Sequence, residues 1–220
     1  DEQCVIPQGK EELFESLSGE CSHLYLAIDG VLAAVIAITD PIREEAPRVV
    51  SMLRKCGLSK IVMMTGDSER TAKVVAAKVG VDEYYSEVLP EDKASYVEKE
   101  HQAGRKVIMI GDGVNDSPAL SAADVGIAIC DGAEMAREIA DITIAGDNLE
   151  ELVTLKRLSN ALVKRIHGNY RQIVGFNTGL ILCGIGGVMQ PATSALLHNT
   201  STLAISVKSM KDLLNEKDEK

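Results

Sequence analysis

The sequence lacks the features that mark several common classes of protein. Its five cysteines are widely spaced with no CxxC pair, which disfavours a disulfide framework or structural zinc site and fits reduced thiols facing the cytosol. Basic residues are too few for a nucleic-acid partner, because the formal net charge is −10 and phosphate binding needs a basic surface. No signal peptide opens the chain, which begins at Asp1 within a polar run, so we expect a fragment of a longer protein.

What is present is typical of a globular protein. The 220 residues are 45% apolar and 25% charged, enough for one sizeable domain plus an appendage. The first pattern along the chain is a pair of apolar runs, residues 24–28 and 31–38, separated by Asp29-Gly30. Because glycine takes positive φ without steric cost, this pattern predicts a β-hairpin.

An alternation of helices and strands follows the hairpin. After Asp40-Pro41, residues 43–56 predict a helix that Gly57 ends. Further on, the expected elements are a strand at 61–64, a helix from Ser68, a strand at 107–110, a helix near Asn115 and a strand at 125–129. Short apolar strands separated by helices indicate an α/β fold with a parallel sheet covered on both faces. Ligands of such sheets bind at the carboxyl ends of the strands.

Polar residues follow two of these strands immediately. Thr65-Gly66-Asp67 comes after the first strand, and the run Gly-Asp-Gly-Val-Asn-Asp at 111–116 comes after the second. Carboxylates suit Mg²⁺, which prefers hard oxygen ligands, and glycines let backbone N–H groups approach phosphate oxygens. The two strand ends therefore predict a site for Mg²⁺ and a phosphate group.

A lysine between the two clusters completes the expected chemistry. Pro90 is placed to begin a helix, which puts Lys93 about one turn in, where its ammonium can offset charge on a transferring phosphoryl group. Each element alone has a simpler interpretation: Thr65-Gly66-Asp67 as an ordinary turn, and Lys93 as part of a solvated helix face.

The ten-residue run GDGVNDSPAL at 111–120 is far more specific, because chance does not readily supply it after an apolar strand. It resembles the signature of P-type ATPases, and the resemblance extends over most of the chain. Further matches are Asp40-Pro41-Ile42-Arg43 to the family's interdomain hinge, Thr65-Gly66-Asp67 and Lys93 to its second and third haloacid-dehalogenase-type motifs, and residues 123–129 and 140–144.

The resemblance assigns roles residue by residue. It implies that Thr65 and Gly66 hold the phosphoryl group, that Asp67 faces the nucleotide side, and that Lys93 takes part in catalysis. It further implies that Asp112 and Asp116 belong to the Mg²⁺ site and that Asn115 contacts phosphate. Mg²⁺ and ATP are the expected cofactors.

One part of the family pattern is missing. The DKTGT segment, whose aspartate is phosphorylated in the family, does not occur in these 220 residues. Because phosphoryl transfer needs a nucleophile, we expect this chain alone neither to autophosphorylate nor to pump, and we expect the missing N-terminal part of the same pump as its partner. Two alternatives remain: a stand-alone haloacid-dehalogenase-type phosphatase, and a non-catalytic domain that binds Mg²⁺ and phosphate. The segment after residues 31–38 lacks a DxDxT/V pattern, which disfavours the phosphatase.

The C-terminal third predicts membrane helices. Residues 149–167 form an amphipathic, basic stretch, and residues 173–189 and 192–207 contain no charged residue. Their 17 and 16 residues fall short of the roughly 20 that span a bilayer, so a soluble helical hairpin is the alternative. Basic residues flank only the outer ends of the pair, which by the positive-inside rule places both ends in the cytoplasm.

Polar side chains within these stretches are candidates for binding the transported ion. Asn177, His198 and Asn199 offer a mixed nitrogen and oxygen set, and intramembrane polar residues tend to mark pathways. The alternative is that such residues hydrogen-bond between helices, which we favour for Cys183. The short ending, with two membrane helices, resembles the heavy-metal subfamily, and the ion stays open among divalent transition metals.

Together these inferences predict a fragment of an ATP-driven pump for divalent heavy-metal cations in the cell membrane, with its phosphorylation domain in the cytoplasm. The expected fold is a haloacid-dehalogenase-like (Rossmann-like) parallel-sheet domain followed by a two-helix transmembrane hairpin in contact with lipid. The expected parts are a remnant of the nucleotide-binding domain (1–38), the phosphorylation domain (39–148), a stalk helix (149–171), two transmembrane helices (172–210) and a cytoplasmic tail (211–220).

Overall fold

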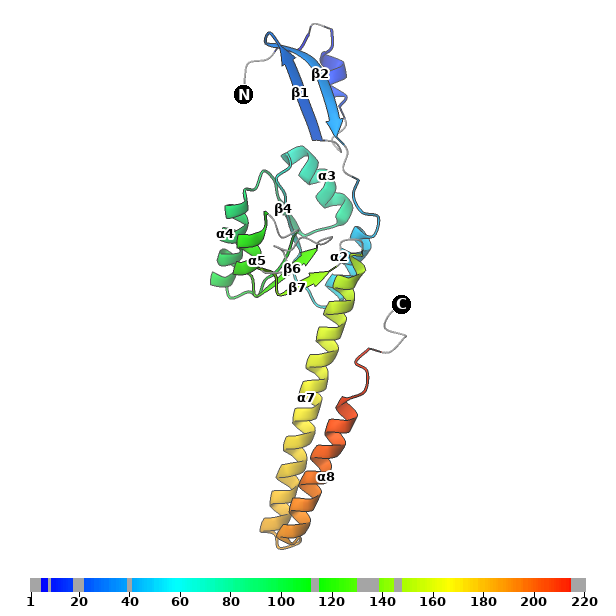
Figure 1. The fold of residues 1–220 in the computed structure, drawn as a ribbon, viewed down its shortest axis with the longest axis vertical. Helices are drawn as coiled ribbons and strands as arrows, with labels where there is room; N and C mark the ends of the chain where they lie inside the picture. Colours follow the sequence, from blue (N-terminus) through cyan, green and yellow to red (C-terminus); the bar gives the residue numbers. More distant parts are fainter. Residues whose placement is uncertain are drawn as a thin grey trace. The chain divides into compact units, whose positions relative to one another are not determined.

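The chain forms two compact units, residues 1–152 and 153–220 (Figure 1). A computed structural model describes residues 5–7, 9–17, 22–38, 41–111, 115–129, 139–144 and 148–214. The division lies close to the expected end of the phosphorylation domain at residue 148; the finer boundaries stay predictions.

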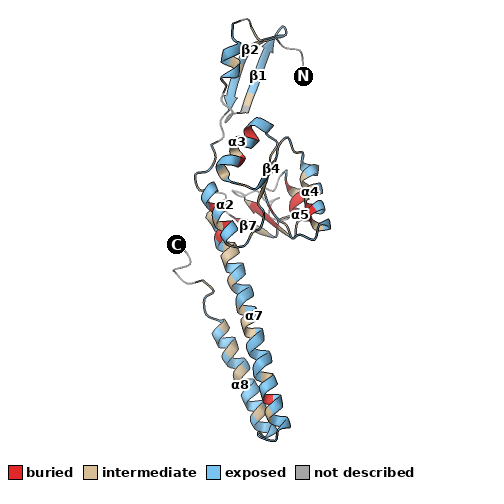
Figure 2. Cartoon of the chain, turned by 180° about the vertical axis from the view of Figure 1, so that it is seen from behind, coloured by how far each residue is buried: buried red, intermediate tan, exposed pale blue. Residues whose placement is uncertain are grey.

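The first unit opens with the predicted hairpin. After a short helix, α1 (Glu11–Glu15), strands β1 (Ser22–Ile28) and β2 (Val31–Ile38) pair antiparallel. Asp29 and Gly30 have φ of 52° and 77°, as the two-residue turn of a twisted hairpin requires. Apolar side chains remain exposed on both faces of the hairpin: Leu24 is 57% exposed and its neighbour Tyr25 is 51% exposed (Figure 2).

A β/α alternation follows, close to the predicted bounds. Its elements are α2 (Ala46–Lys55), β3 (Val62–Met64), α3 (Glu69–Val79), β4 (Glu83–Tyr85), α4 (Pro90–Gln102), β5 (Ile108–Gly111), α5 (Ser117–Ala122), β6 (Val125–Ile129) and β7 (Ile142–Ile144). α2 begins three residues later than predicted, because Pro47 occupies its first turn. Gly57, with φ of 101°, follows its end.

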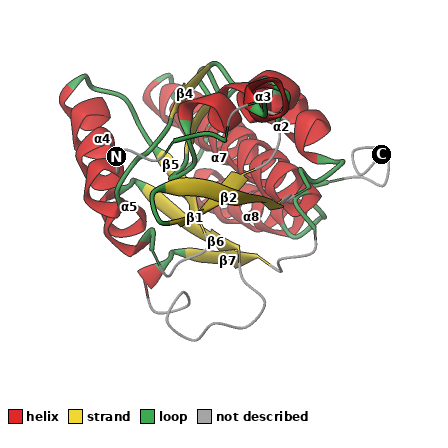
Figure 3. Ribbon diagram, turned by 90° about the horizontal axis from the view of Figure 1, so that it is seen from above, coloured by secondary structure: helices red, strands yellow, loops and turns green. Residues whose placement is uncertain are grey.

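The strands form two parallel sheets, β3-β4 and β5-β6-β7. The parallel arrangement confirms the α/β prediction. β4 and β7 were not predicted as strands; each has only three residues, too few to show an apolar period. Helices α4 and α5 lie together on one side of strands β5 and β6 (Figure 3).

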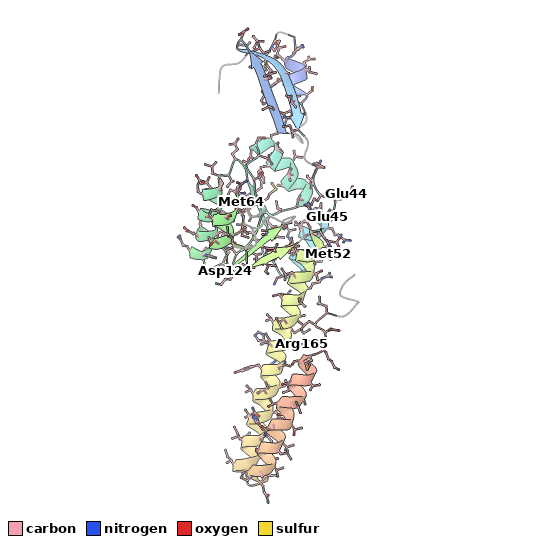
Figure 4. The ribbon with its side chains drawn as sticks, in the orientation of Figure 1. Glu44, Glu45, Met52, Met64, Asp124 and Arg165 are labelled. Carbon is pink, nitrogen blue, oxygen red and sulfur yellow. The ribbon has the colours of Figure 1, made fainter. Side chains whose placement is uncertain are left out.

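One buried cluster joins elements of both sheets. Val97 of α4, Met109 of β5, and Ala119 and Leu120 of α5 are at most 8% exposed, and Met64 of β3 packs against them (Figure 4 labels Met64). Because Met64 ends β3 and Met109 lies in β5, the cluster places the polar segments after both strands on the same core. The fold therefore brings the two predicted clusters into one region.

The second unit is a helical hairpin. Helix α7 (Glu150–Ile185) runs without interruption for 36 residues, so the expected stalk and first apolar stretch form one helix. Helix α8 (Pro191–Ser209) begins with Pro191 in its first turn, after a turn in which Gly187 has φ of 69°. No helix within the described ranges combines the length and apolarity needed to cross a membrane.

Candidate active site at the ends of the parallel strands

The Thr65-Gly66-Asp67 segment forms a tight loop directly after β3. The Thr65 hydroxyl donates to the Asp67 carboxylate over 2.9 Å and accepts from the Asp67 backbone N–H over 3.1 Å. Thr65 is half-buried, whereas Gly66 and Asp67 are exposed. The loop therefore presents a glycine backbone and a carboxylate to solvent at the carboxyl end of the strand.

A neighbouring segment fixes this loop through the backbone. The N–H of Val88 donates to the Thr65 carbonyl over 3.0 Å, and the N–H of Glu87 donates to the Asp67 carbonyl over 2.9 Å. Glu87 has a φ of 53°, an unusual value for a residue with a side chain. Sequence reasoning missed this support, because no local pattern marks a non-glycine residue that takes positive φ.

Glu69, at the start of α3, holds the same supporting segment by its side chain. Its carboxylate accepts hydrogen bonds from the Ser86 hydroxyl over 2.6 Å and the Tyr84 hydroxyl over 2.7 Å. These two donors, Ser86 first, lower the pKa of Glu69 below its ordinary value. Glu69 was not among the predicted site residues.

Lys93 and Asp116 form the most shielded ion pair in this region. The Lys93 Nζ lies 2.7 Å from the Asp116 Oδ1, and their side chains are only 15% and 12% exposed. Lys93 stands in the first turn of α4, where Pro90 predicted it. Asp116 precedes α5 but makes no side-chain cap for it. One oxygen of its carboxylate, Oδ1, accepts from Lys93, so the structure joins two predicted site residues that are 23 positions apart.

Gly111 makes this position of Asp116 possible. A Cβ atom on Gly111 would stand 2.3 Å from the Asp116 Oδ2 and 2.7 Å from the Asp116 Cβ, closer than real atoms approach. The first glycine of the signature thus creates room for a carboxylate. Gly126 in β6 plays a similar part, because its Cβ would lie 2.7 Å from the Leu120 carbonyl oxygen.

Two predicted residues of this site remain, Asn115 and Asp112. Asn115 is exposed beside Asp116, in a position open to a ligand. Asp112 lies outside the described residues, so its place in the Mg²⁺ site stays a prediction. Among the residues that the structure does describe, no group of three or more His, Cys, Asp or Glu side chains is arranged to hold a metal ion.

The carboxylate of Asp124 stabilises the opposite end of the sheet. Asp124 accepts hydrogen bonds from the Lys106 ammonium (2.7 Å), the Val107 backbone N–H (2.8 Å) and the His101 Nε2 (2.8 Å) (Figure 4). These donors, Lys106 foremost, hold the pKa of Asp124 far below its ordinary value. Asp124 joins the end of α4 to the start of β5, a structural role that its sequence context did not reveal.

In the helical hairpin, two of the three predicted ion-binding residues meet. The Nδ1 of His198 lies 2.8 Å from the Oδ1 of Asn177, across the two helices. Asn199 is exposed. Ser201 and Thr202 instead donate to the His198 carbonyl within α8, over 2.8 and 3.0 Å.

The loop after β3 and the Lys93–Asp116 pair, which joins α4 to the start of α5, thus flank one buried core of the α/β unit. Residues 5–124 match the haloacid dehalogenase-like hydrolases, and the chain belongs to this family.

Comparison with individual proteins confirms the resemblance to heavy-metal P-type ATPases. The chain is 42% identical to a zinc-exporting P-type ATPase of Mycobacterium marinum over 189 residues, 86% of this chain and 26% of that protein. It is 43% identical over 176 residues to copper-transporting ATPase 2 of Rhizobium meliloti, covering 80% of this chain and 21% of the relative. The chain thus spans about a quarter of the length of the curated relatives it matches.

A solved structure agrees with these relatives. The crystal structure of a zinc-transporting PIB-type ATPase in its E2.Pi state superposes with a TM-score of 0.81 at 28% identity. The match covers 95% of this chain and 34% of that one. Such coverage necessarily includes most of α7 and α8 as well as the α/β unit.

Proposed function

We propose that this chain is part of an ATP-driven transporter of divalent transition-metal cations that works through an aspartyl-phosphate intermediate. The observation that carries the proposal is the shielded Lys93–Asp116 pair, which shares a core with the Thr65-Gly66-Asp67 loop. A buried ion pair costs desolvation energy and is weak support for stability. Its position at the strand ends instead suits a charged reaction centre.

Each site residue has its own role in phosphoryl transfer. Thr65 and Gly66 hold the phosphoryl oxygens through a hydroxyl and a backbone N–H, and Lys93 neutralises charge that develops on them. Asp67 faces the nucleotide, and Asn115 contacts phosphate. Carboxylate oxygens suit Mg²⁺, which would be held by Asp116 with Asp112 and would screen the phosphate charge when bound.

The nucleophile must come from another part of the longer protein. In the described part of the chain β3 pairs only with β4, and β5 pairs only with β6, although Met64 and Met109 contact the same core cluster. A further parallel strand that bridges β3 and β5 would end beside Thr65 and Lys93, and an aspartate at that end would be in place for phosphorylation. The hairpin β1-β2, exposed on both faces, likewise has the surface of a strand pair that belongs to a larger domain.

For α7 and α8 we propose a membrane-embedded hairpin. α8 has 19 residues and is therefore about 28 Å long, near the roughly 30 Å of a bilayer's hydrocarbon core. Large apolar side chains are exposed along both helices, with Leu182 at 63% and Leu203 at 66%. The similarity to a zinc-transporting ATPase over 95% of the chain supports the same assignment.

His198 and Asn177 are the proposed contribution of this hairpin to ion binding, with Asn199 as a further ligand. Their contact across the helices brings an imidazole nitrogen and an amide oxygen together, a donor set suited to a borderline divalent cation. The relatives described above are a zinc-exporting and a copper-transporting ATPase, which supports a transition metal as the transported ion.

The test uses the full-length protein and two partial reactions. We expect His198→Ala to abolish metal-stimulated ATP hydrolysis while phosphorylation from inorganic phosphate survives, because the latter needs only the cytosolic site. His167→Ala, a matched exposed histidine on α7, should keep metal stimulation. Full metal stimulation in His198→Ala would remove this residue from the ion site.

Mg²⁺-dependent phosphomonoester hydrolysis by the 220-residue chain alone would favour the phosphatase alternative and refute the need for an external nucleophile.

A further inference from the structure

A polar cavity of about 500 Å³ lies between α7 and α8 near the end of the hairpin where the chain finishes. Its lining is rich in cations: Arg165, Asn169, Lys208, Lys211 and Asp212. Three of these five side chains carry positive charge and one carries negative charge, so the hollow favours an anion. None of these residues belongs to the phosphoryl-transfer site or the proposed ion site.

The cavity is built on a fixed framework. The guanidinium of Arg165 (labelled in Figure 4) donates to the carbonyls of Ser209, Lys211 and Asp212, including a 2.6 Å bond to Asp212. The Ser209 carbonyl is among the last acceptors of α8, and those of Lys211 and Asp212 follow the end of the helix, where a cation is favourable. Asn169 donates to the Ser209 hydroxyl over 2.7 Å. One wall is therefore held by hydrogen bonds between the two helices.

Two lysines are available to a ligand at this framework. Lys208 is exposed and has only a long contact, 3.4 Å from its Nζ to the Gln172 Oε1. Lys211 is exposed, and among the described residues its Nζ has no acceptor. Ammonium groups that are mobile and weakly partnered bind phosphate oxygens without first breaking strong bonds.

We infer that this cavity binds the headgroup of an anionic phospholipid. The inference rests on the proposed membrane position of the hairpin. The uncharged stretch at 173–189 begins, and the one at 192–207 ends, within a few residues of the cavity lining, and Val207 and Met210 beside it are 57% and 83% exposed. A soluble phosphate would leave this apolar surface uncovered. The acyl chains of a phospholipid would cover it while the lipid's phosphate binds Lys208 and Lys211.

The test measures lipid binding to the full-length protein in detergent. The protein is titrated with phosphatidylglycerol and, separately, with phosphatidylcholine, and bound lipid is counted by native mass spectrometry. We expect Lys208→Gln/Lys211→Gln to weaken phosphatidylglycerol binding about 25-fold, because each lysine at an anionic lipid contributes about fivefold. Asp212→Asn should strengthen the same binding, because it removes the one carboxylate of the lining. Phosphatidylcholine binding should not change in either variant.

The control is Lys156→Gln/Lys164→Gln, which removes the same charge from α7 outside the cavity lining. An equal loss in both double variants would show a general charge effect and overturn the site. Displacement of phosphatidylglycerol by excess inorganic phosphate would show a soluble-phosphate site and overturn the lipid assignment. If the variants keep metal-stimulated ATP hydrolysis, either of these two results overturns only the lipid site and leaves the transport proposal unaffected. A full-length protein that does not float with lipid vesicles overturns the membrane position and this inference together.

Discussion

Replacement of Gly111 by alanine tests whether the first glycine of the signature exists to admit Asp116. The added Cβ would meet the Asp116 Oδ2, Cγ and Cβ at 2.3, 2.8 and 2.7 Å, so the whole carboxyl group must move. Moving it breaks the 2.7 Å contact with Lys93, which has little solvent to replace its partner. Overpacking costs about 1–3 kcal/mol and a lost hydrogen bond to a charged group about 1.5–3 kcal/mol.

Gly66→Ala is the matched control, because a Cβ at Gly66 has nothing within 4 Å. Neither glycine has positive φ, so an alanine at Gly66 should be neutral or stabilise by up to about 1 kcal/mol through the unfolded chain. The net difference between the two variants is then about 3 kcal/mol in the free energy of unfolding. For a chain of this size it corresponds to roughly 6–12 °C in the midpoint of thermal unfolding.

The assay is thermal unfolding of both variants and the parent, followed by circular dichroism in one buffer. Equal midpoints for Gly111→Ala and Gly66→Ala would show that Asp116 relaxes without cost, and the steric argument would then be wrong. In the full-length protein, Gly111→Ala should also slow phosphoenzyme formation, because Lys93 and Asp116 are both displaced.

Three further predictions concern positions that carry the fold or the site. Gly126→Ala should lower the thermal midpoint at least as much, because its Cβ would meet the rigid Leu120 carbonyl at 2.7 Å; an unchanged midpoint would contradict this. A double-mutant cycle of Lys93→Ala and Asp116→Ala should give a coupling of about 0.5–3 kcal/mol in urea unfolding, and strict additivity would show that the pair does not interact. The depressed pKa of Asp124 adds stability that is complete above the unfolded value near 4 and is lost as pH falls below it. Asp124→Asn should therefore be less stable at pH 7, with the gap closing below about pH 4; a pH-independent gap would refute the linkage.

Much of the α/β fold follows from local sequence rules. The turn at Asp29-Gly30 and the start of α4 at Pro90 depend on backbone preferences of a few adjacent residues, and the structure agrees with both. The run GDGVNDSPAL at 111–120 is equally local, so the sequence alone is enough to identify the family. Lys93 was placed correctly because helix geometry relates it to Pro90.

Other features depend on contacts between distant positions, which no local pattern encodes. Lys93 pairs with Asp116 across separate segments, and Gly111 leaves the space that Asp116 fills. The hydrogen bond from the Glu87 N–H to the Asp67 carbonyl also joins separate segments. Strands β4 and β7 exist because a neighbouring strand supplies their hydrogen bonds, since three residues have too weak a propensity to define a strand. Burial and pairing energies arise only when the chain folds, and for that reason they appear in the packed structure and not in the order of the residues.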